Sequence, residues 1–132
     1  MSNRALGNTF EQELCEKLYE QGFWVKNLKQ DSAGQPADVI AVRNRVAYLI
    51  DAKVCTHDNF SLKRVESNQE TAMELWTSCG NGQGWFAFKT SNGTFMMPHS
   101  VVKSYQFNGS AMKLTDIETL GKQLETWVRR CK

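Results

Sequence analysis

The chain has 132 residues, of which 41% are hydrophobic and 11% aromatic, enough for the core of one compact domain with little room for a second. This composition excludes an intrinsically disordered protein, and no apolar run approaches the ~20 residues of a membrane-spanning helix. A formal net charge of +2 permits a polyanionic partner but is too small to indicate one.

The N-terminal residues lack the apolar segment of a secretory signal peptide, so we expect a soluble protein of the cytoplasm. The cysteines stand apart and form no C-x-x-C pair, which is typical of reduced thiols rather than of a zinc site. They are Cys15, Cys55, Cys79 and Cys131.

Helix and strand patterns alternate along the chain. Phe10, Leu14 and Leu18 recur at helical spacing after Asn8, so we expect a helix that Asn8 caps and Gly22 ends. There follow, in order, a strand at 23–28, a loop at 29–36, strands at 37–42 and 46–54 joined by a polar turn at 43–45, a polar segment at 55–64, a helix at 67–79, strands at 84–89 and 94–97, and a helix at 115–130. This order predicts an α/β fold in one domain, with a central mixed sheet of about five strands flanked by helices.

Asp51 and Lys53 stand near the end of the strand predicted over residues 46–54. Because alternate residues of a strand share a face, the two side chains project side by side. Residues 47–50 are apolar, so this strand is largely buried, where charged residues are rare unless they are paired or coordinate something. A simple ion pair and a catalytic pair both explain the pattern.

Asp38 begins the preceding predicted strand. If residues 43–45 form a tight turn, the two strands pair antiparallel and Asp38 lies close to Asp51. Two neighbouring carboxylates repel each other, and a bound divalent cation relieves that repulsion. Oxygen ligands in a chain with only two histidines favour Mg²⁺, or Mn²⁺ in its place, over zinc. The alternative is that Asp38 caps a turn after Pro36.

Glu11 is the acidic residue of the first helix that lies nearest its apolar face. With Leu14 at the centre of that face, 100° per residue places Glu11 about 60° away, compared with about 100° for Glu13 and about 160° for Glu16. Glu11 is therefore either a further metal ligand or a capping-box residue only. Together the residues predict a metal-dependent DNA-cleaving centre, in which Lys53 orients or deprotonates a water and stabilises the growing charge.

Two short segments carry a resemblance to known nucleases. Pro36-Ala37-Asp38 followed by Asp51-Ala52-Lys53 resembles the signature of the PD-(D/E)XK nuclease superfamily. Further segments are similar to Holliday junction resolvases of the archaeal and RecU types: Gly7-Asn8-Thr9-Phe10-Glu11, Phe60-Ser61-Leu62 with Gln69 after it, residues 84–88 and residues 95–98. The similarity covers about residues 7–98.

The resemblance implies a restriction-endonuclease-like core and a structure-selective endonuclease that resolves four-way DNA junctions as a homodimer. It also implies that Glu11, Asp38 and Asp51 hold Mg²⁺, that Lys53 is catalytic, and that Gln69 supports the site or contacts the scissile phosphate. Asp51 stands where the resolvases usually have Glu, and no stalk-like insertion of the RecU type follows Asp38.

Two rival functions remain open at this point. One is a restriction-like or repair nuclease of the same superfamily, and the other is an inactive DNA-binding module with the same fold. The short chain is also compatible with a phage-encoded member that acts in the host cytoplasm.

Small and basic residues flank the predicted site in sequence and are candidate phosphate contacts, although each also suits an ordinary solvated surface. They are Lys29, Ser32, Arg43, Arg45, Lys63 and Arg64. Residues 55–64 are expected to form a mobile substrate loop that Phe60 anchors to the core. A stripe of Ile117, Leu120, Leu124 and Trp127 predicts the packed face of the last helix.

Overall fold

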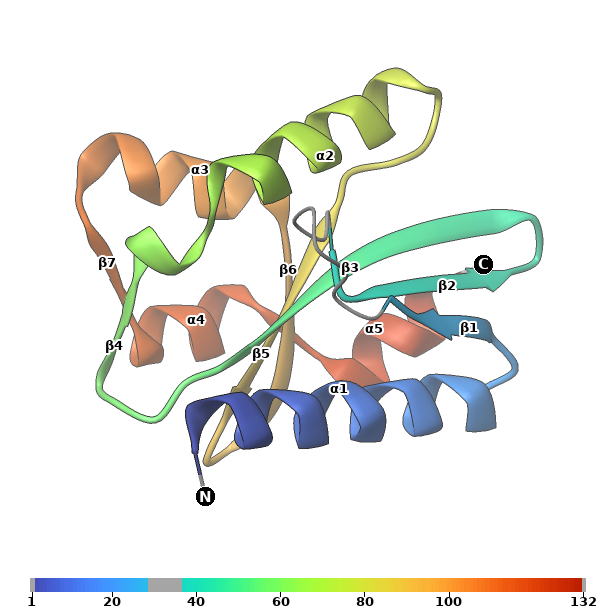
Figure 1. The fold of residues 1–132 in the computed structure, drawn as a ribbon, viewed down its shortest axis with the longest axis horizontal. Helices are drawn as coiled ribbons and strands as arrows, with labels where there is room; N and C mark the ends of the chain where they lie inside the picture. The colour runs from blue at the N-terminus through green and yellow to red at the C-terminus, as the bar shows by residue number, and fades with distance from the viewer. Residues whose placement is uncertain (1, 29–36, 132) are drawn as a thin grey trace.

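The computed structural model describes residues 2–28 and 37–131, to which the following is confined. Helices cover both faces of a six-stranded mixed sheet, as Figure 1 shows. One face packs against α1 (Asn3–Glu20) and α5 (Leu124–Arg130), and the other against α2 (Ser67–Ser78), α3 (His99–Asn108) and α4 (Leu114–Leu120). The predicted α/β fold class is confirmed.

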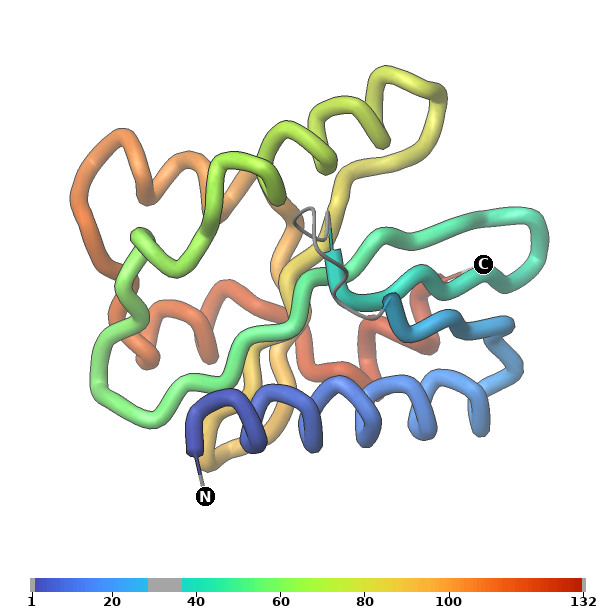
Figure 2. Tube along the Cα trace, in the orientation of Figure 1, coloured from blue at the N-terminus to red at the C-terminus, as the bar shows by residue number. Residues whose placement is uncertain are grey.

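The main sheet has the order β1-β2-β3-β5-β6-β8, and β3 lies near its middle (Figure 2). Its strands are β1 (Trp24–Asn27), β2 (Val39–Arg43), β3 (Val46–Val54), β5 (Trp85–Thr90), β6 (Gly93–Pro98) and β8 (Lys122–Gln123). A separate pair joins β4 (Asn59–Ser61) to β7 (Ala111–Lys113), and the 3-10 helix η1 (Leu62–Arg64) follows β4. The sheet has six strands rather than about five because β8 adds to the edge of β6.

The hairpin of β2 and β3 brings the predicted carboxylates together. Its register runs from Val39 opposite Ile50 to Arg43 opposite Val46, so the turn itself is Asn44 and Arg45. Both turn residues have positive φ, 52° and 71°, the backbone that a two-residue hairpin of this twist requires. The turn is thus shorter than predicted, and the pairing places Asp38 beside the Asp51 end of β3.

The parallel pairing of β3 with β5 makes the sheet mixed and requires a crossover, which contains α2. In this pairing Asp51 lies opposite Phe86, and β6 then places Met97 opposite Phe86. Asp51, Phe86 and Met97 therefore form one row across three neighbouring strands, and Asp51 lies near the centre of the sheet.

Two apolar clusters fill the layers on either side of the sheet. Beneath α1 and α5 lie Phe10, Leu14, Leu18, Phe23, Val39, Ala41, Ile50, Ala87, Met96, Leu124, Trp127 and Val128. The cluster on the α2 face includes Leu49, Phe60, Met73, Phe86, Phe88, Phe95, Met97, Val102, Met112 and Ile117. Alternate residues of each strand divide between the two clusters, as period-two patterning requires.

Two helix boundaries differ from the predictions. The first helix begins at Asn3 and is capped by Ser2, whose side chain accepts a hydrogen bond from Ala5 N, so Asn8 is not its cap. The predicted helix at 115–130 is wrong, because it is divided into α4 and α5 with β8 between them. Gly121 lies at the break with extended backbone, and a Cβ there would stand 2.6 Å from Ile117 O.

Two smaller expectations also change. Leu120 is 53% exposed, so it does not belong to the buried stripe that Ile117, Leu124 and Trp127 form. The expectation of an unpaired loop over residues 55–64 is wrong for Asn59–Ser61, which pairs with β7. Phe60 is buried there, as expected for an anchor.

No helix in the described part of the chain has the length and apolar character to cross a bilayer.

Candidate active site

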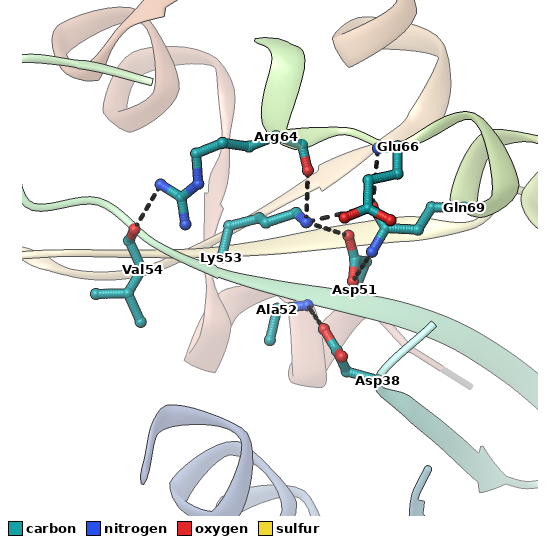
Figure 3. A network of polar contacts seen from close by, with 8 residues as sticks. All are labelled: Asp38, Asp51, Ala52, Lys53, Val54, Arg64, Glu66 and Gln69. Atoms are coloured by element: carbon teal, nitrogen blue, oxygen red, sulfur yellow. Dashed lines mark hydrogen bonds and ion pairs between the residues drawn. The ribbon is translucent and has the colours of Figure 1, made fainter. Parts of the chain in front are cut away.

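Asp51 is a fully buried carboxylate in the middle of the sheet. Its exposed fraction is 0%, and its Oδ1 accepts a hydrogen bond of 3.3 Å from Gln69 Nε2 (Figure 3). Its Oδ2 lies 3.1 Å from Lys53 Nζ but accepts no well-directed hydrogen bond from any described residue. A buried carboxylate needs compensation, and Asp51 retains acceptor capacity that these neighbours do not use.

Asp38 stands beside Asp51 at the start of β2. Its main-chain N donates to Ile50 O at 3.1 Å, and its Oδ2 accepts a hydrogen bond of 2.7 Å from Ala52 N. These two bonds hold the Asp38 side chain against β3. Burial raises the pKa of Asp51 well above its ordinary range, and the adjacent Asp38 raises it further, whereas Lys53 lowers it. A positive group added beside these carboxylates would therefore favour the ionised form of Asp51.

Lys53 makes one ion pair and two hydrogen bonds through its Nζ. Besides Asp51, its Nζ lies 2.8 Å from the main-chain oxygen of Arg64 and 3.2 Å from Gln69 Oε1. Strand alternation places Lys53 on the same face as Asp51, as predicted. The ammonium is thus fixed at the centre of a polar network rather than projecting into solvent.

Gln69 bridges the two charged groups from α2. It occupies the N3 position of that helix, where its Oε1 also accepts a hydrogen bond of 3.2 Å from Glu66 N as part of a capping box. Its amide therefore donates to Asp51 and accepts from Lys53 at the same time (Figure 3). The helix start that the capping box stabilises also sets the position of this side chain.

Glu11 approaches from α1, on the opposite face of the sheet from Gln69. Burial raises its pKa to about 7, with a further increase from Asp38 and an opposing effect of Lys53. Glu11 therefore interacts electrostatically with Asp38 and Lys53. Among the described residues, however, no three His, Cys, Asp or Glu side chains converge closely enough to hold one ion together. The structure brings Asp38 and Asp51 into contact and leaves Glu11 as a neighbour.

The candidate phosphate contacts are dispersed. Arg43 packs its guanidinium 4.3 Å from the centre of the Phe23 ring and donates to three main-chain oxygens, which belong to Gln21, Val128 and Cys131. Arg45 is exposed in the hairpin turn, far along β2 from Asp38.

The remaining candidates lie nearer the site or outside the described chain. Lys63 is exposed in η1, and Arg64 donates to Val54 O at 2.9 Å and lies over the Phe60 ring. Lys29 and Ser32 fall outside the described residues.

Sequence reasoning missed the main-chain groups of the site. Ala52 N orients Asp38, and Arg64 O holds Lys53, but neither contact depends on the type of side chain at those positions. The nearness of the Cys15 thiol to the site was also missed: burial raises its pKa to about 11, and Glu11 and Asp38 add to the increase. Its position one turn after Glu11 was the available signal.

The family model described as archaeal Holliday junction resolvase (Hjc) matches residues 2–129. The chain belongs to this family. Membership makes it a Holliday junction resolvase nuclease, in agreement with the resemblance found in the sequence.

Solved structures share the fold of this resolvase. Hjc of the archaeal hyperthermophile Archaeoglobus fulgidus, a Holliday junction resolvase, is 16% identical with a TM-score of 0.68, over 92% of this chain and 96% of that chain. The bacterial homing endonuclease I-Ssp6803I is 15% identical with a TM-score of 0.55, over 84% of this chain and 73% of that one. A search of curated protein sequences gives no match.

Proposed function

We propose that this resolvase is a magnesium-dependent endonuclease that acts as a homodimer, each copy nicking one of two opposing strands of a four-way DNA junction. The observation that carries the proposal is the contact of two carboxylates, Asp38 and Asp51, with the Lys53 ammonium 3.1 Å from Asp51. This combination supplies a place for a cation and a fixed positive group beside it.

The residues fit a small divalent cation. Asp51 is buried, its pKa is raised by burial and by Asp38, and its Oδ2 has unused acceptor capacity. Additional positive charge at this point relieves the repulsion between the carboxylates. Asp38 and Asp51 would hold Mg²⁺, or Mn²⁺ in its place, and Glu11 would contribute from α1. When bound, such an ion polarises the phosphodiester and lowers the pKa of a water.

The side chains of the chain itself orient the reacting groups. Lys53 donates to Arg64 O and Gln69 Oε1, and its contact with Asp51 Oδ2 is an ion pair without a well-directed hydrogen bond, so its third N–H can turn to a water or to a phosphate oxygen. Arg64 O and Gln69 Oε1 hold the ammonium while the contact with Asp51 is exchanged. We therefore assign Lys53 to orientation of the nucleophile and stabilisation of charge, and Gln69 to support of both groups.

Binding of the DNA junction and dimerisation are also part of the proposal. Lys63 and Arg45 are exposed and suit salt-dependent phosphate contacts, and Lys29 and Ser32 stay predictions for the loop before Asp38. The most exposed apolar side chains are candidate contacts for a second copy: Trp24 at 63%, Leu75 at 61% and Phe107 at 82%. A cytoplasmic location also stays a prediction.

Labelled DNA of several shapes tests the proposal. A four-way junction, a linear duplex and single strands are incubated with the protein, with and without Mg²⁺, and the mass of the free and DNA-bound protein is measured by analytical ultracentrifugation. We expect paired symmetric nicks in the junction alone, only with Mg²⁺, by a protein of twice the chain mass. Equal cutting of duplex indicates a restriction-like or repair nuclease, and binding without cutting indicates an inactive module.

A further inference from the structure

The first turn of α2 contacts the rest of the molecule through two adjacent side chains that point in different directions. Gln69 reaches Asp51 and Lys53, as described above. Glu70 is rotated by about 100° around the helix, and its Oε1 lies 3.4 Å from His99 Nε2. Contacts in two directions fix both the position and the rotation of a helix turn, whereas a contact in one direction leaves rotation free.

His99 is firmly attached to the strands that carry the active site. It is only 7% exposed, its N donates to Gly84 O at 2.9 Å, and its ring lies 6.2 Å from that of Phe86. Phe86 is the residue opposite Asp51 in the pairing of β3 with β5. The imidazole, at the start of α3, is therefore attached to the end of β5 and contacts Phe86, the neighbour of Asp51 across the sheet.

We propose that Glu70 and His99 are positioning residues for cleavage: their contact fixes the rotation of α2, so that Gln69 holds Lys53 against Asp51. This inference rests on the proposed cleavage chemistry. It assigns no contact with DNA or metal to either residue. Their effect passes through Gln69, the neighbour of Glu70 in the helix.

Apolar packing alone does not supply this precision. The buried anchor of α2 is Met73, which packs against Gly84, where an added Cβ would lie 2.5 Å from Met73 Cγ. Such a contact holds the helix close to the sheet, but an unbranched methionine adapts to small rotations. A directed polar contact with a buried partner resists them, and a shift of about 1 Å at a reacting group can cost a hundredfold in rate.

A second ion pair between the same helices provides a matched control. Lys103 of α3 contacts Glu74 of α2 at 3.3 Å, but the two side chains are 47% and 58% exposed. The His99 and Glu70 side chains are only 9% and 26% exposed. Exposed pairs contribute little, and Glu74 lies more than one turn away from Gln69. Glu70→Ala and Glu74→Ala thus change the same residue type in one helix with different expected results.

Single-turnover cleavage of a four-way junction at saturating protein tests the proposal. We expect Glu70→Ala to lower the rate constant about tenfold, the effect of one lost hydrogen bond at the site, with junction affinity unchanged. Glu70→Gln keeps an acceptor and should restore most of the rate, and Glu74→Ala should match the wild type. The decisive comparison uses Gln69→Ala, in which a further Glu70→Ala change should have almost no effect. An equal loss in both backgrounds would show that Glu70 does not act through Gln69.

A second measurement needs no cleavage at all. In ¹⁵N spectra of the metal-free protein, the Gln69 side-chain NH₂ should give two well-separated signals that move toward free-amide positions in Glu70→Ala but not in Glu74→Ala. If the wild type fails to cut junctions, the proposed function is wrong, but this spectrum still tests whether Glu70 positions Gln69. Unchanged Gln69 signals in a folded Glu70→Ala protein would overturn the positioning role.

Discussion

The two faces of β3 are both buried at their centre but differ in chemistry over the second half of the strand. Ile50, Ala52 and Val54 face α1 and α5 and pack into an apolar cluster. The other row contains Asp51 and Lys53, which face α2. Ile50 and Asp51 both have an exposed fraction of 0%, so burial does not separate them.

The difference shows where folding and function make opposite demands on one strand. The apolar row stabilises the fold by removing hydrophobic surface from water. The charged row has the opposite effect, because a buried carboxylate is costly even with a neighbouring ammonium. Local rules that a protein breaks in its core tend to mark its functional sites. Substitutions on the two sides of the sheet should therefore separate cleavage from stability.

Asp51→Asn should give the largest effect on cleavage. The amide keeps the shape of the side chain but removes the charge that would hold a cation, so we expect junction cleavage to fall about a thousandfold or more. Junction binding should remain, because the proposed phosphate contacts lie elsewhere. Gel-shift and cleavage assays on the same preparation check this result.

The same variant should be more stable than the wild type in metal-free buffer. Because the pKa of Asp51 is raised by burial and by Asp38, the wild type loses stability as pH rises from about 4 through that raised pKa. Asparagine does not titrate, so the advantage of the variant in thermal melts should grow as the pH rises above about 4. Normal cleavage by Asp51→Asn would contradict the assignment of the site.

Much of this row arrangement could be predicted because its determinants are local. Strand alternation placed Asp51 beside Lys53, and the short polar turn placed Asp38 beside Asp51. Val46–Val54 is the strand that the apolar pattern predicted, with the same bounds. The position of Gln69 near the site came from the family resemblance, since no local pattern connects α2 to β3.

The elements that were predicted wrongly depend on distant contacts. The pairing of Asn59–Ser61 with Ala111–Lys113 joins segments about 50 residues apart, and neither segment has a hairpin signal. The break at Gly121 results from close packing against Phe95, because a Cβ would stand 3.0 Å from its Cβ. The hydrogen bonds of the Arg43 guanidinium to main-chain oxygens at the end of α5 were likewise not predictable from its charge, and its contact with DNA stays a prediction.

Leu18→Ala should change stability without changing chemistry. Leu18 is fully buried in the cluster on the apolar face, so its truncation should lower the free energy of unfolding by about 2–5 kcal/mol. The cleavage rate of the folded fraction should stay within about twofold of the wild type. Denaturant titration and single-turnover assays at low temperature measure the two quantities. A large loss of rate in a fully folded variant would mean that the two faces are not independent.

Glu11 lies on the α1 side of the sheet, but its pKa still depends on the charges of Asp38 and Lys53. Its pKa is raised to about 7 by burial and Asp38, so below that pH it is mostly protonated and cannot contribute to a cation site. Affinity for Mn²⁺ should therefore rise with pH by up to about tenfold per unit until about pH 7 and then flatten. Glu11→Gln should show a shallower rise, which comes from the Asp51 and Asp38 pair. Identical pH dependence in calorimetric titrations of both proteins would remove Glu11 from the site.

The hairpin turn should give the smallest effect, because both rows of β3 end there in solvent. Arg45 has φ of 71°, a backbone that costs a residue with a side chain about 1 kcal/mol. Arg45→Gly should therefore raise the free energy of unfolding by less than about 1 kcal/mol, since glycine also loses more entropy on folding. Asn44→Gly is the matched control at φ of 52°, where asparagine is already tolerated and no charge is lost.

If Arg45 contacts a phosphate, only Arg45→Gly should reduce the slope of junction affinity against salt, by about one. Equal salt slopes for the two variants would show that Arg45 makes no phosphate contact.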